Sequence, residues 1–323
     1  MVIKMQISLL EIAEILKEKD NFYILTHKSP DGDTIGSAYA LYYALKQLNK
    51  KAKVLCSDDI PRRYDFLYKD SIDEDFEPSC IISVDIADLT LLGENLEIFS
   101  DKIDICIDHH IYSSDFAKFS YVNPKAGANC ENIFELLNFM GVKIDETIAN
   151  CLYTGISTDT GCFRYSNVTA NTHKIAAQLI ERGAKSAKIN KLMFDTKSRA
   201  KVELENKALD TLEFFCSGKG ALICITKQML QETGAAEEDT DSISSIPRKI
   251  ENVLVGVTIK ERTNDEYKIS VRTDDKVNAA KLCFAFGGGG HQCAGGCTVK
   301  GELAQVKAKI IEIVEKELMK ISL

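Results

Sequence analysis

No stretch of this 323-residue sequence reaches the roughly 18 consecutive apolar residues that a membrane-spanning helix needs. The chain also lacks any C-x-x-C pair, although it contains 11 cysteines. Most of these cysteines lie in apolar, strand-like runs, where a free thiol behaves as a small hydrophobic side chain. We therefore expect no membrane partner and no disulfide framework, and we predict a protein of the reducing cytoplasm.

Basic residues are outnumbered by acidic ones, 40 against 48, which gives a formal net charge of −8. Proteins that bind long nucleic acid without sequence preference need many Lys and Arg side chains against the phosphates. We therefore expect no long nucleic acid as a partner. A short anion could still bind in a locally basic or metal-filled pocket, so any nucleic-acid substrate should be small.

The length of the chain fits two domains, and the first half alternates apolar strand-like runs with helical patterns. Near-continuous apolar strands between amphipathic helices are typical of a parallel sheet that is covered on both faces. We therefore predict an α/β domain over residues 1–186, with a parallel sheet and helices on both faces. The predicted strands are 23–26, 53–56, 80–85, 104–108 and 119–122, and the predicted helices are about 34–49, 128–140, 145–156 and 170–182.

The rest of the chain predicts a charged helical linker over 187–215 and a smaller α/β domain over 216–323. This second domain should contain a hairpin, because two strand patterns are separated by a short polar segment. The predicted elements are a strand at 221–226, the hairpin strands 253–259 and 267–272, a helix, a glycine-rich loop, and a final helix from about residue 303.

Residues of the kind that ligate metals follow three of the predicted strands, and a further acid follows a helical run. One acid after a strand more often caps the next helix. Four such positions are different, because the carboxyl ends of parallel strands meet at one edge of a sheet. Three of the five histidines in the chain lie at these positions. The residues are His27, Asp31 and Asp33; Asp85; Asp108, His109 and His110; and Asp159.

The mixture of ligand types indicates a particular chemistry. Carboxylates suit hard cations, and added imidazoles shift the preference towards Mn, Fe or Zn over Ca. A carboxylate can also bridge two ions about 3.5–4 Å apart, which clamps the attacking and leaving oxygens of an in-line displacement. The pattern therefore favours a two-metal hydrolase.

Four segments, HKSPDGD, VDIAD, DHH and TGISTDTG, resemble in order and spacing the motifs of the DHH phosphoesterase superfamily. GGGGH at 287–291 followed by AGG resembles the DHH-associated C-terminal domain. The resemblance covers nearly the whole chain. Size and layout are most similar to the branch of bifunctional oligoribonucleases and 3′-phosphoadenosine 5′-phosphate phosphatases, which implies two Mn²⁺ ions, with Mg²⁺ or Co²⁺ as substitutes.

The resemblance also implies a role for each matching residue. One metal would be held by His27, Asp31 and Asp85, and the other by Asp33, Asp85, His109 and Asp159, with Asp85 bridging. Asp108 would orient a histidine, and His110 would act near the scissile phosphate as a stabiliser or proton donor. From the second domain, the substrate phosphate would be bound by Arg272, Gly288, Gly289, Gly290 and His291. Gly295 departs from the family pattern, which more often has alanine, and should loosen the loop without abolishing binding.

Several other residues have simpler interpretations. His173 has no acidic neighbours in sequence, which favours a structural role, and we expect the same of Asp88. Cys293 and Cys297 with His291 do not complete a four-ligand zinc site. Whether Arg62, Arg63 and Arg164 face a cleft or solvent stays open, and N-capping is the default role for Asn129.

Three functions compete. The leading hypothesis is hydrolysis of short oligoribonucleotides, linear dinucleotides or 3′-phosphoadenosine 5′-phosphate, by hydroxide attack on phosphorus between two metals. A cyclic-dinucleotide phosphodiesterase of the same superfamily is the first alternative. A non-catalytic nucleotide- or RNA-binding module is the second, although every expected ligand position is filled. A homodimer is compatible with the sequence.

Overall fold

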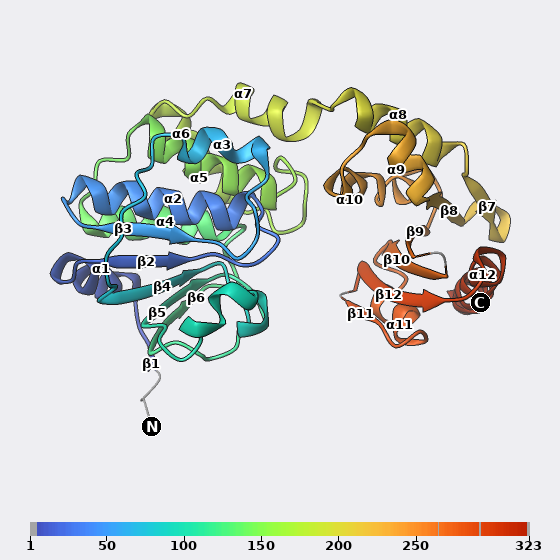
Figure 1. Ribbon diagram of the computed structural model, residues 1–323, viewed down its shortest axis with the longest axis horizontal. Coiled ribbons are helices and arrows are strands. Elements are labelled where there is room, and N and C mark those ends of the chain that lie inside the picture. The colour runs from blue at the N-terminus through green and yellow to red at the C-terminus, as the bar shows by residue number, and fades with distance from the viewer. Residues whose placement is uncertain (1–4, 264, 291, 322–323) are drawn as a thin grey trace. The chain divides into compact units, whose positions relative to one another are not determined.

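The computed structural model describes residues 5–263, 265–290 and 292–321. The chain divides into two compact units, Met1–Thr196 and Lys197–Leu323, and each unit has its own sheet (Figure 1). The segment predicted as a linker contributes its first ten residues, 187–196, to the first unit and the rest to the second.

The first unit is built on a six-stranded sheet in which every paired strand is parallel, in the order β1-β6-β5-β4-β2-β3. Its central strand β4 is buried at every residue, as expected for an apolar run that is covered on both faces. The strands are β1 (Met5–Gln6), β2 (Phe22–Leu25), β3 (Ala52–Leu55), β4 (Cys80–Val84), β5 (Ile105–Asp108) and β6 (Phe119–Val122).

One face of this sheet packs against α-helices, and the other against short 3₁₀ helices and the loops around them. Side chains that alternate along β2 and β4 point to opposite faces, so that Ile24 and Ile82 join the main core whereas Leu25 and Ile81 join a smaller one. The helices are α1 (Leu9–Glu18), α2 (Gly32–Gln47), α3 (Asp65–Tyr68), α4 (Asn129–Met140), α5 (Glu146–Asp159), α6 (Ala170–Glu181) and α7 (Ser186–Asn190), with shorter turns η1 (Arg62–Tyr64), η2 (Leu89–Leu91), η3 (Glu94–Phe99) and η4 (Lys191–Asp195).

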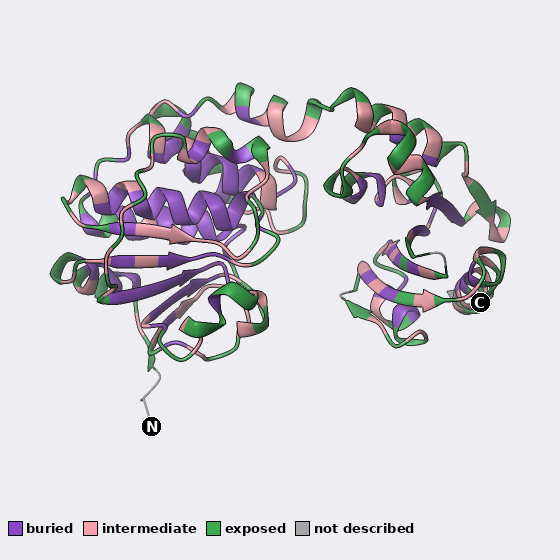
Figure 2. Ribbon diagram, in the orientation of Figure 1, coloured by how far each residue is buried: buried purple, intermediate pink, exposed green. Residues whose placement is uncertain are grey.

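Helix α2 lies in the middle of the main core, and most of its surface is buried (Figure 2). Small residues allow it to approach α5 closely. A Cβ added at Gly36 would lie 2.5 Å from the carbonyl oxygen of Cys151, and one at Gly155 would lie 2.7 Å from Asp33 Oδ1. This close packing fixes the start of α2 against the last turns of α5.

The second unit is a mixed six-stranded sheet in the order β11-β12-β10-β9-β8-β7, in which only the β8–β9 pair is parallel among the described residues. Helices α11 and α12 pack on one face, and α8, α9 and α10 cover the β8–β9 part of the other. The elements are α8 (Arg199–Leu209), β7 (Glu213–Phe215), η5 (Cys216–Gly218), β8 (Gly220–Ile225), α9 (Lys227–Thr233), η6 (Glu237–Asp239), α10 (Thr240–Ile243), η7 (Pro247–Lys249), β9 (Val255–Thr263), β10 (Glu266–Thr273), α11 (Ala279–Phe284), β11 (Gly289–Gly290), β12 (Ala294–Lys300) and α12 (Leu303–Ile321).

The predicted α/β class, the parallel sheet and the β9–β10 hairpin are confirmed. The helices that cover one face of the parallel sheet are α-helices, and those on the other face are the short 3₁₀ helices η2 and η3. Strand β12 differs from the prediction, because the sequence predicts only a glycine-rich loop there. Glycine suits this strand since the neighbouring backbone is close: a Cβ added at Gly295 would lie 2.7 Å from the carbonyl oxygen of Ala279.

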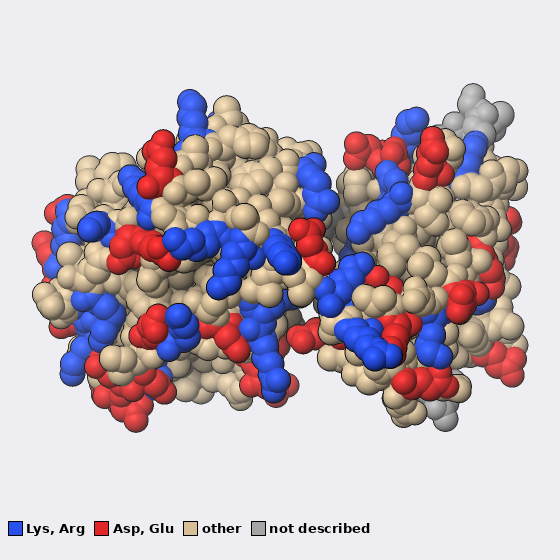
Figure 3. Space-filling model, turned by 90° about the horizontal axis from the view of Figure 1, so that it is seen from above, with Lys and Arg blue, Asp and Glu red and all other residues tan. Residues whose placement is uncertain are grey.

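Two surface features complete the description. None of the described helices is both long and apolar enough to pass through a membrane. On the face that Figure 3 shows, basic and acidic side chains are interspersed in both units.

Candidate metal centre

The residues predicted to ligate metal meet at the carboxyl edge of the parallel sheet, as topology requires. His27 follows β2, Asp85 follows β4, and Asp108 ends β5 and is followed by His109 and His110. Asp31 and Asp33 lie at the start of α2, and Asp159 is the last residue of α5. The chain brings them together around a cavity of about 320 Å³ whose lining includes His27, Asp31, Asp85, His109, His110 and Asp159.

The first group of potential ligands is centred on His27. Its Nε2 lies 3.7 Å from Asp31 Oδ1 and 3.8 Å from Asp85 Oδ2. Its Nδ1 lies 2.8 Å from the carbonyl oxygen of Lys28, which can only accept a hydrogen bond, so Nδ1 donates and Nε2 faces the carboxylates. Asp31 is held in place as the N-cap of α2, because its Oδ1 accepts from the backbone N–H groups of Asp33 and Thr34.

The second group is centred on His109. Its Nε2 lies 3.4 Å from Asp85 Oδ1, 3.7 Å from Asp33 Oδ2 and 3.8 Å from Asp159 Oδ2. Its Nδ1 donates to the carbonyl oxygen of Ala126 at 3.2 Å, which again leaves Nε2 for the carboxylates. Both groups have the ligand types and the close spacing that a metal ion requires.

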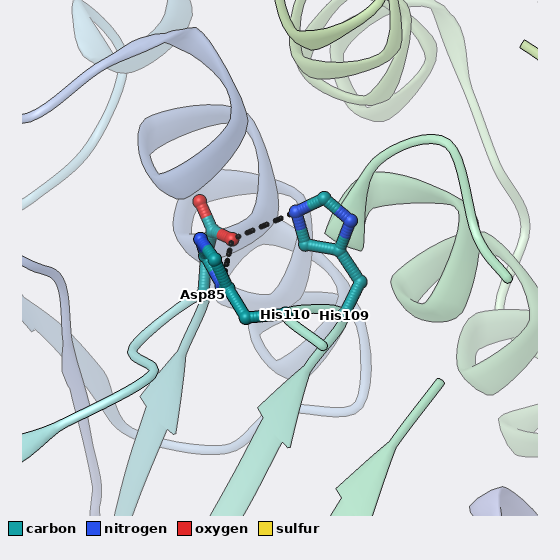
Figure 4. A group of neighbouring side chains, drawn as sticks. All are labelled: Asp85, His109 and His110. Carbon is teal, nitrogen blue, oxygen red and sulfur yellow. Dashed lines mark ion pairs between the residues drawn. The ribbon is translucent and has the colours of Figure 1, made fainter. Parts of the chain in front are cut away.

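Asp85 belongs to both groups, because each of its two oxygens faces a different histidine. The oxygen that faces His109, Oδ1, also lies 3.8 Å from His110 Nδ1, as the dashed lines in Figure 4 show. The side chain is buried, and Oδ1 has no hydrogen-bond partner among the described residues. The backbone of Asp85 is left-handed, with φ of 59°, a conformation that non-glycine residues adopt at a cost and that clusters at functional sites.

Carboxylates outnumber histidines in the two groups of ligands, and this excess of acidic groups suits bound cations. Burial, and then the Asp33 carboxylate nearby, raise the pKa of Asp85 well above its usual range. The same two causes raise the pKa of Asp159 to about 7. Burial lowers the pKa of His109, but the carboxylates of Asp85, Asp33 and Asp159 outweigh it and raise the pKa to about 10. Divalent cations would replace these protons as the balancing charge, so the residues fit a metal centre.

Asp33 has a second task that the sequence does not indicate. Helix α4 has Ala128 at its N-cap position, with no side-chain cap of its own. Instead, the two carboxylate oxygens of Asp33 accept from the first backbone N–H groups of that helix, Asn129 at 2.6 Å and Cys130 at 2.9 Å. A carboxylate at a helix N-terminus is stabilised by the helix dipole. Asn129 is therefore not the N-cap that the sequence predicts, and its side chain donates to Ser37 Oγ instead.

Asp108 and His110 form a tight pair beside the two groups. His110 Nδ1 donates to Asp108 Oδ1 at 2.7 Å. Burial raises the pKa of Asp108, but the bond to His110 outweighs it and the net pKa lies below the usual value. His110 keeps 44% of its side chain exposed, whereas Asp108 is fully buried, so the aspartate orients a histidine that faces the cavity.

Asn167 is a site residue that sequence reasoning missed. Its Nδ2 donates to the carbonyl oxygens of Gly127 and Asp159, at 2.7 and 3.2 Å, and lies 3.3 Å from Asp159 Oδ2. It thus ties the loop before α4 to the acid at the end of α5. Asn167 lies outside the recognisable motifs, and nothing in the surrounding sequence marks it.

The predicted substrate-binding residues lie in the second unit. Arg272, on β10, pairs across the sheet with Ala294 on β12, and its side chain is partly buried. Gly289 and Gly290 form β11 and pair with Gly296 and Gly295 on β12, and Gly288 directly precedes them. His291 lies outside the described residues.

The remaining predicted residues have structural partners. The ring of His173 stacks on Phe163, with centroids 5.4 Å apart and planes at 23°. Asp88 accepts from Thr90 N–H at the start of η2. Cys293 Sγ donates to Asp275 Oδ1, and Cys297 is buried in the core of the second unit. Arg164 Nε donates to the carbonyl oxygen of Gly161.

The sequence of this chain matches two protein-family models and is similar to a characterised type of enzyme along almost its whole length. The model of the DHH family, N-terminal domain, matches residues 21–156, and the DHHA1 domain matches residues 223–320. The bifunctional oligoribonuclease and PAP phosphatase NrnA of Thermus thermophilus is 34% identical over 316 residues, which cover 95% of this chain and 93% of that protein.

Two solved structures have the same fold. An exopolyphosphatase-related protein from Bacteroides fragilis matches with a TM-score of 0.85 and 26% identity, over 97% of this chain and 96% of that chain. The exonuclease RecJ bound to manganese matches with a TM-score of 0.57 and 13% identity, over 95% and 94%.

Proposed function

Since this chain belongs to the DHH family, we propose that it is a metal-dependent phosphoesterase that hydrolyses short oligoribonucleotides, linear dinucleotides and 3′-phosphoadenosine 5′-phosphate. The observation that carries the proposal is the placement of Asp85, a buried carboxylate whose two oxygens face two separate groups of ligands. The similarity to the Thermus protein, whose name states both activities, supports the choice of substrates.

The site would hold two divalent ions. His27, Asp31 and Asp85 would bind one, and Asp33, Asp85, His109 and Asp159 the other. We propose Mn²⁺ for both, because carboxylates suit this ion and added imidazoles shift the preference away from harder cations. Mg²⁺ or Co²⁺ would serve as substitutes. When bound, such ions supply Lewis acidity and lower the pKa of water to near neutrality.

The side chains of the protein position these groups and handle protons. The backbone hydrogen bonds of α2 and α4 hold Asp31 and Asp33 rigid, so their oxygens do not need to reorganise during the reaction. His110, oriented by Asp108, is available to donate a proton or a hydrogen bond from its partly exposed ring. Arg272 and the glycine segment Gly288–Gly290 would bind a phosphate of the substrate.

The test is a hydrolysis assay with Mn²⁺ and four substrates side by side: linear diadenylate, a five-nucleotide RNA, 3′-phosphoadenosine 5′-phosphate and cyclic di-AMP. We expect turnover of the first three and none of the cyclic compound. Preferred cleavage of the cyclic compound would assign the protein to cyclic-dinucleotide degradation. Binding without turnover of any substrate would indicate a non-catalytic nucleotide-binding module.

A further inference from the structure

The second unit contains a cavity of about 610 Å³, and among the described residues only Gly288 belongs both to its lining and to the proposed phosphate contacts. Its volume is within the range of ligand-binding pockets. Two cationic side chains, Arg262 and Lys268, line it together with the hydroxyl-bearing Thr298. The other lining residues are Glu266, Phe286, Gly287, Gly288, Gly296 and Cys297.

The two cations reach this cavity from neighbouring strands. Lys268 on β10 pairs with Thr298 on β12, so both line the cavity from adjacent positions. Arg262 lies on β9 where the register with β10 shifts, because Glu261 pairs with Tyr267 but Thr263 pairs with Glu266. Arg262 is thus the extra residue of a β-bulge. Bulges redirect a side chain and are common next to binding sites.

The charge of the cavity is available for an anion. Arg262 and Lys268 are exposed, and neither forms an ion pair with any residue that the structure describes. Glu266 is the acidic residue in the lining, and Lys300 lies 3.4 Å from its carboxylate and offsets its charge.

Gly287 and Gly288 form part of the wall of the cavity. A Cβ added at Gly288 would lie 2.2 Å from the carbonyl oxygen of Gly296 and 2.4 Å from Cys297 Cβ. Only glycine therefore fits at this position without displacing β12. The backbone at Gly288 therefore packs directly against β12 where the two line the cavity.

The cavity lies apart from Arg272 along the same strand. Residues 268, 270 and 272 point to the same face of β10, because side chains alternate along a strand. Four residue steps along the extended strand separate the Cα atoms of Lys268 and Arg272 by about 14 Å. The guanidinium of Arg272 is held at its own position on the strand, because Nη1 donates to the carbonyl oxygen of Val271. We therefore assign Lys268 to a different phosphate of the same oligonucleotide from the one at Arg272.

We propose that Arg262, Lys268 and Thr298 form a second phosphate subsite, which binds a backbone phosphodiester of an oligoribonucleotide beyond the phosphate at Arg272. This inference rests on the proposed function, since it assumes that the chain hydrolyses short RNA. Diadenylate has a single phosphodiester, and 3′-phosphoadenosine 5′-phosphate carries both phosphates on one ribose. Neither can occupy both positions, so the subsite serves longer substrates only.

The test compares Lys268→Gln with Lys309→Gln. Lys309 is an exposed residue of α12, on the helix that covers the opposite face of the sheet, and its replacement removes the same charge from the same unit. For the five-nucleotide RNA, we expect Lys268→Gln to raise KM about threefold, and the Arg262→Gln/Lys268→Gln double variant about tenfold. The slope of log KM against log salt should become shallower by about 0.7 for each cation removed from the subsite. Diadenylate and 3′-phosphoadenosine 5′-phosphate should keep their wild-type KM and kcat.

A further variant removes a negative charge from the cavity instead of a positive one. Glu266→Gln removes the acid from the cavity and frees Lys300, so it should lower KM for the five-nucleotide RNA about twofold and leave diadenylate unchanged. Equal effects on the RNA and on diadenylate, or an equal effect of Lys309→Gln, would overturn the subsite while leaving the proposed function intact. If wild-type protein turned over neither substrate, the proposed function itself would be wrong.

Discussion

Replacing Asp85 with asparagine should separate metal binding from folding. Burial and the nearby Asp33 carboxylate raise the pKa of Asp85 well above its usual range, so its negative charge is costly to bury in the metal-free protein. Asparagine has the same shape and removes this cost, because it carries no charge. The free energy of unfolding of the metal-free protein should therefore change by no more than about 1 kcal/mol in Asp85→Asn.

The response to manganese should differ sharply. Wild-type protein with Mn²⁺ at 100 times its Kd should gain about 2.7 kcal/mol. In a unit of this size that corresponds to a rise in Tm of about 5–10 °C. Asp85→Asn removes a charged ligand that both groups share, so at the same Mn²⁺ concentration the rise should be absent and turnover should fall at least about 10³-fold.

The assay is thermal unfolding followed by circular dichroism, with chelated and Mn²⁺-loaded protein. Asp88→Asn is the matched control, because it changes an acid of the same VDIAD segment that caps η2 and does not belong to the described lining of the cavity. Its Mn²⁺-dependent rise in Tm should equal that of wild type. A wild-type rise in Asp85→Asn, or a large loss of stability without metal, would refute the bridging role.

Three further predictions address other residues of the site. Asp33→Ala should lower the free energy of unfolding of the metal-free protein by about 1–2 kcal/mol, because the backbone N–H groups of Asn129 and Cys130 lose their acceptor. An unchanged midpoint of urea unfolding would contradict this. Asn167→Ala should weaken Mn²⁺ binding about tenfold by calorimetry, since its side chain no longer positions Asp159; an unaltered Kd would show that Asn167 is dispensable. Arg272→Ala should raise KM about tenfold with the Mn²⁺ content unchanged, and metal loss in this variant would place Arg272 in the wrong role.

The architecture of the first unit could be read from the sequence because its strands are short, apolar and separated by amphipathic helices. The predicted strand 80–85 and the observed β4, Cys80–Val84, differ by one residue. Strand β12 could not be predicted from the sequence in the same way. Its glycines give no strand pattern, and the reason for Gly295 is tertiary, because a side chain there would strike the backbone of Ala279.

Some residues of the candidate site could be predicted from the sequence, and others could not. Residues within the four motifs could be named because they follow strands whose ends must meet at one sheet edge. The capping of α4 by Asp33 joins positions 96 residues apart in the chain, and Asn167 contacts Asp159 through a loop without a recognisable pattern. Such contacts depend on how helices pack, which periodicity and spacing do not determine. The assignment of ligands to each ion stays a prediction.

The most direct test of the central claim is hydrolysis of linear diadenylate by chelator-treated protein, measured before and after Mn²⁺ is restored. The proposed phosphoesterase should show no turnover without metal and rapid turnover once Mn²⁺ is added. Equal rates with and without metal, or no cleavage in either condition, would contradict it.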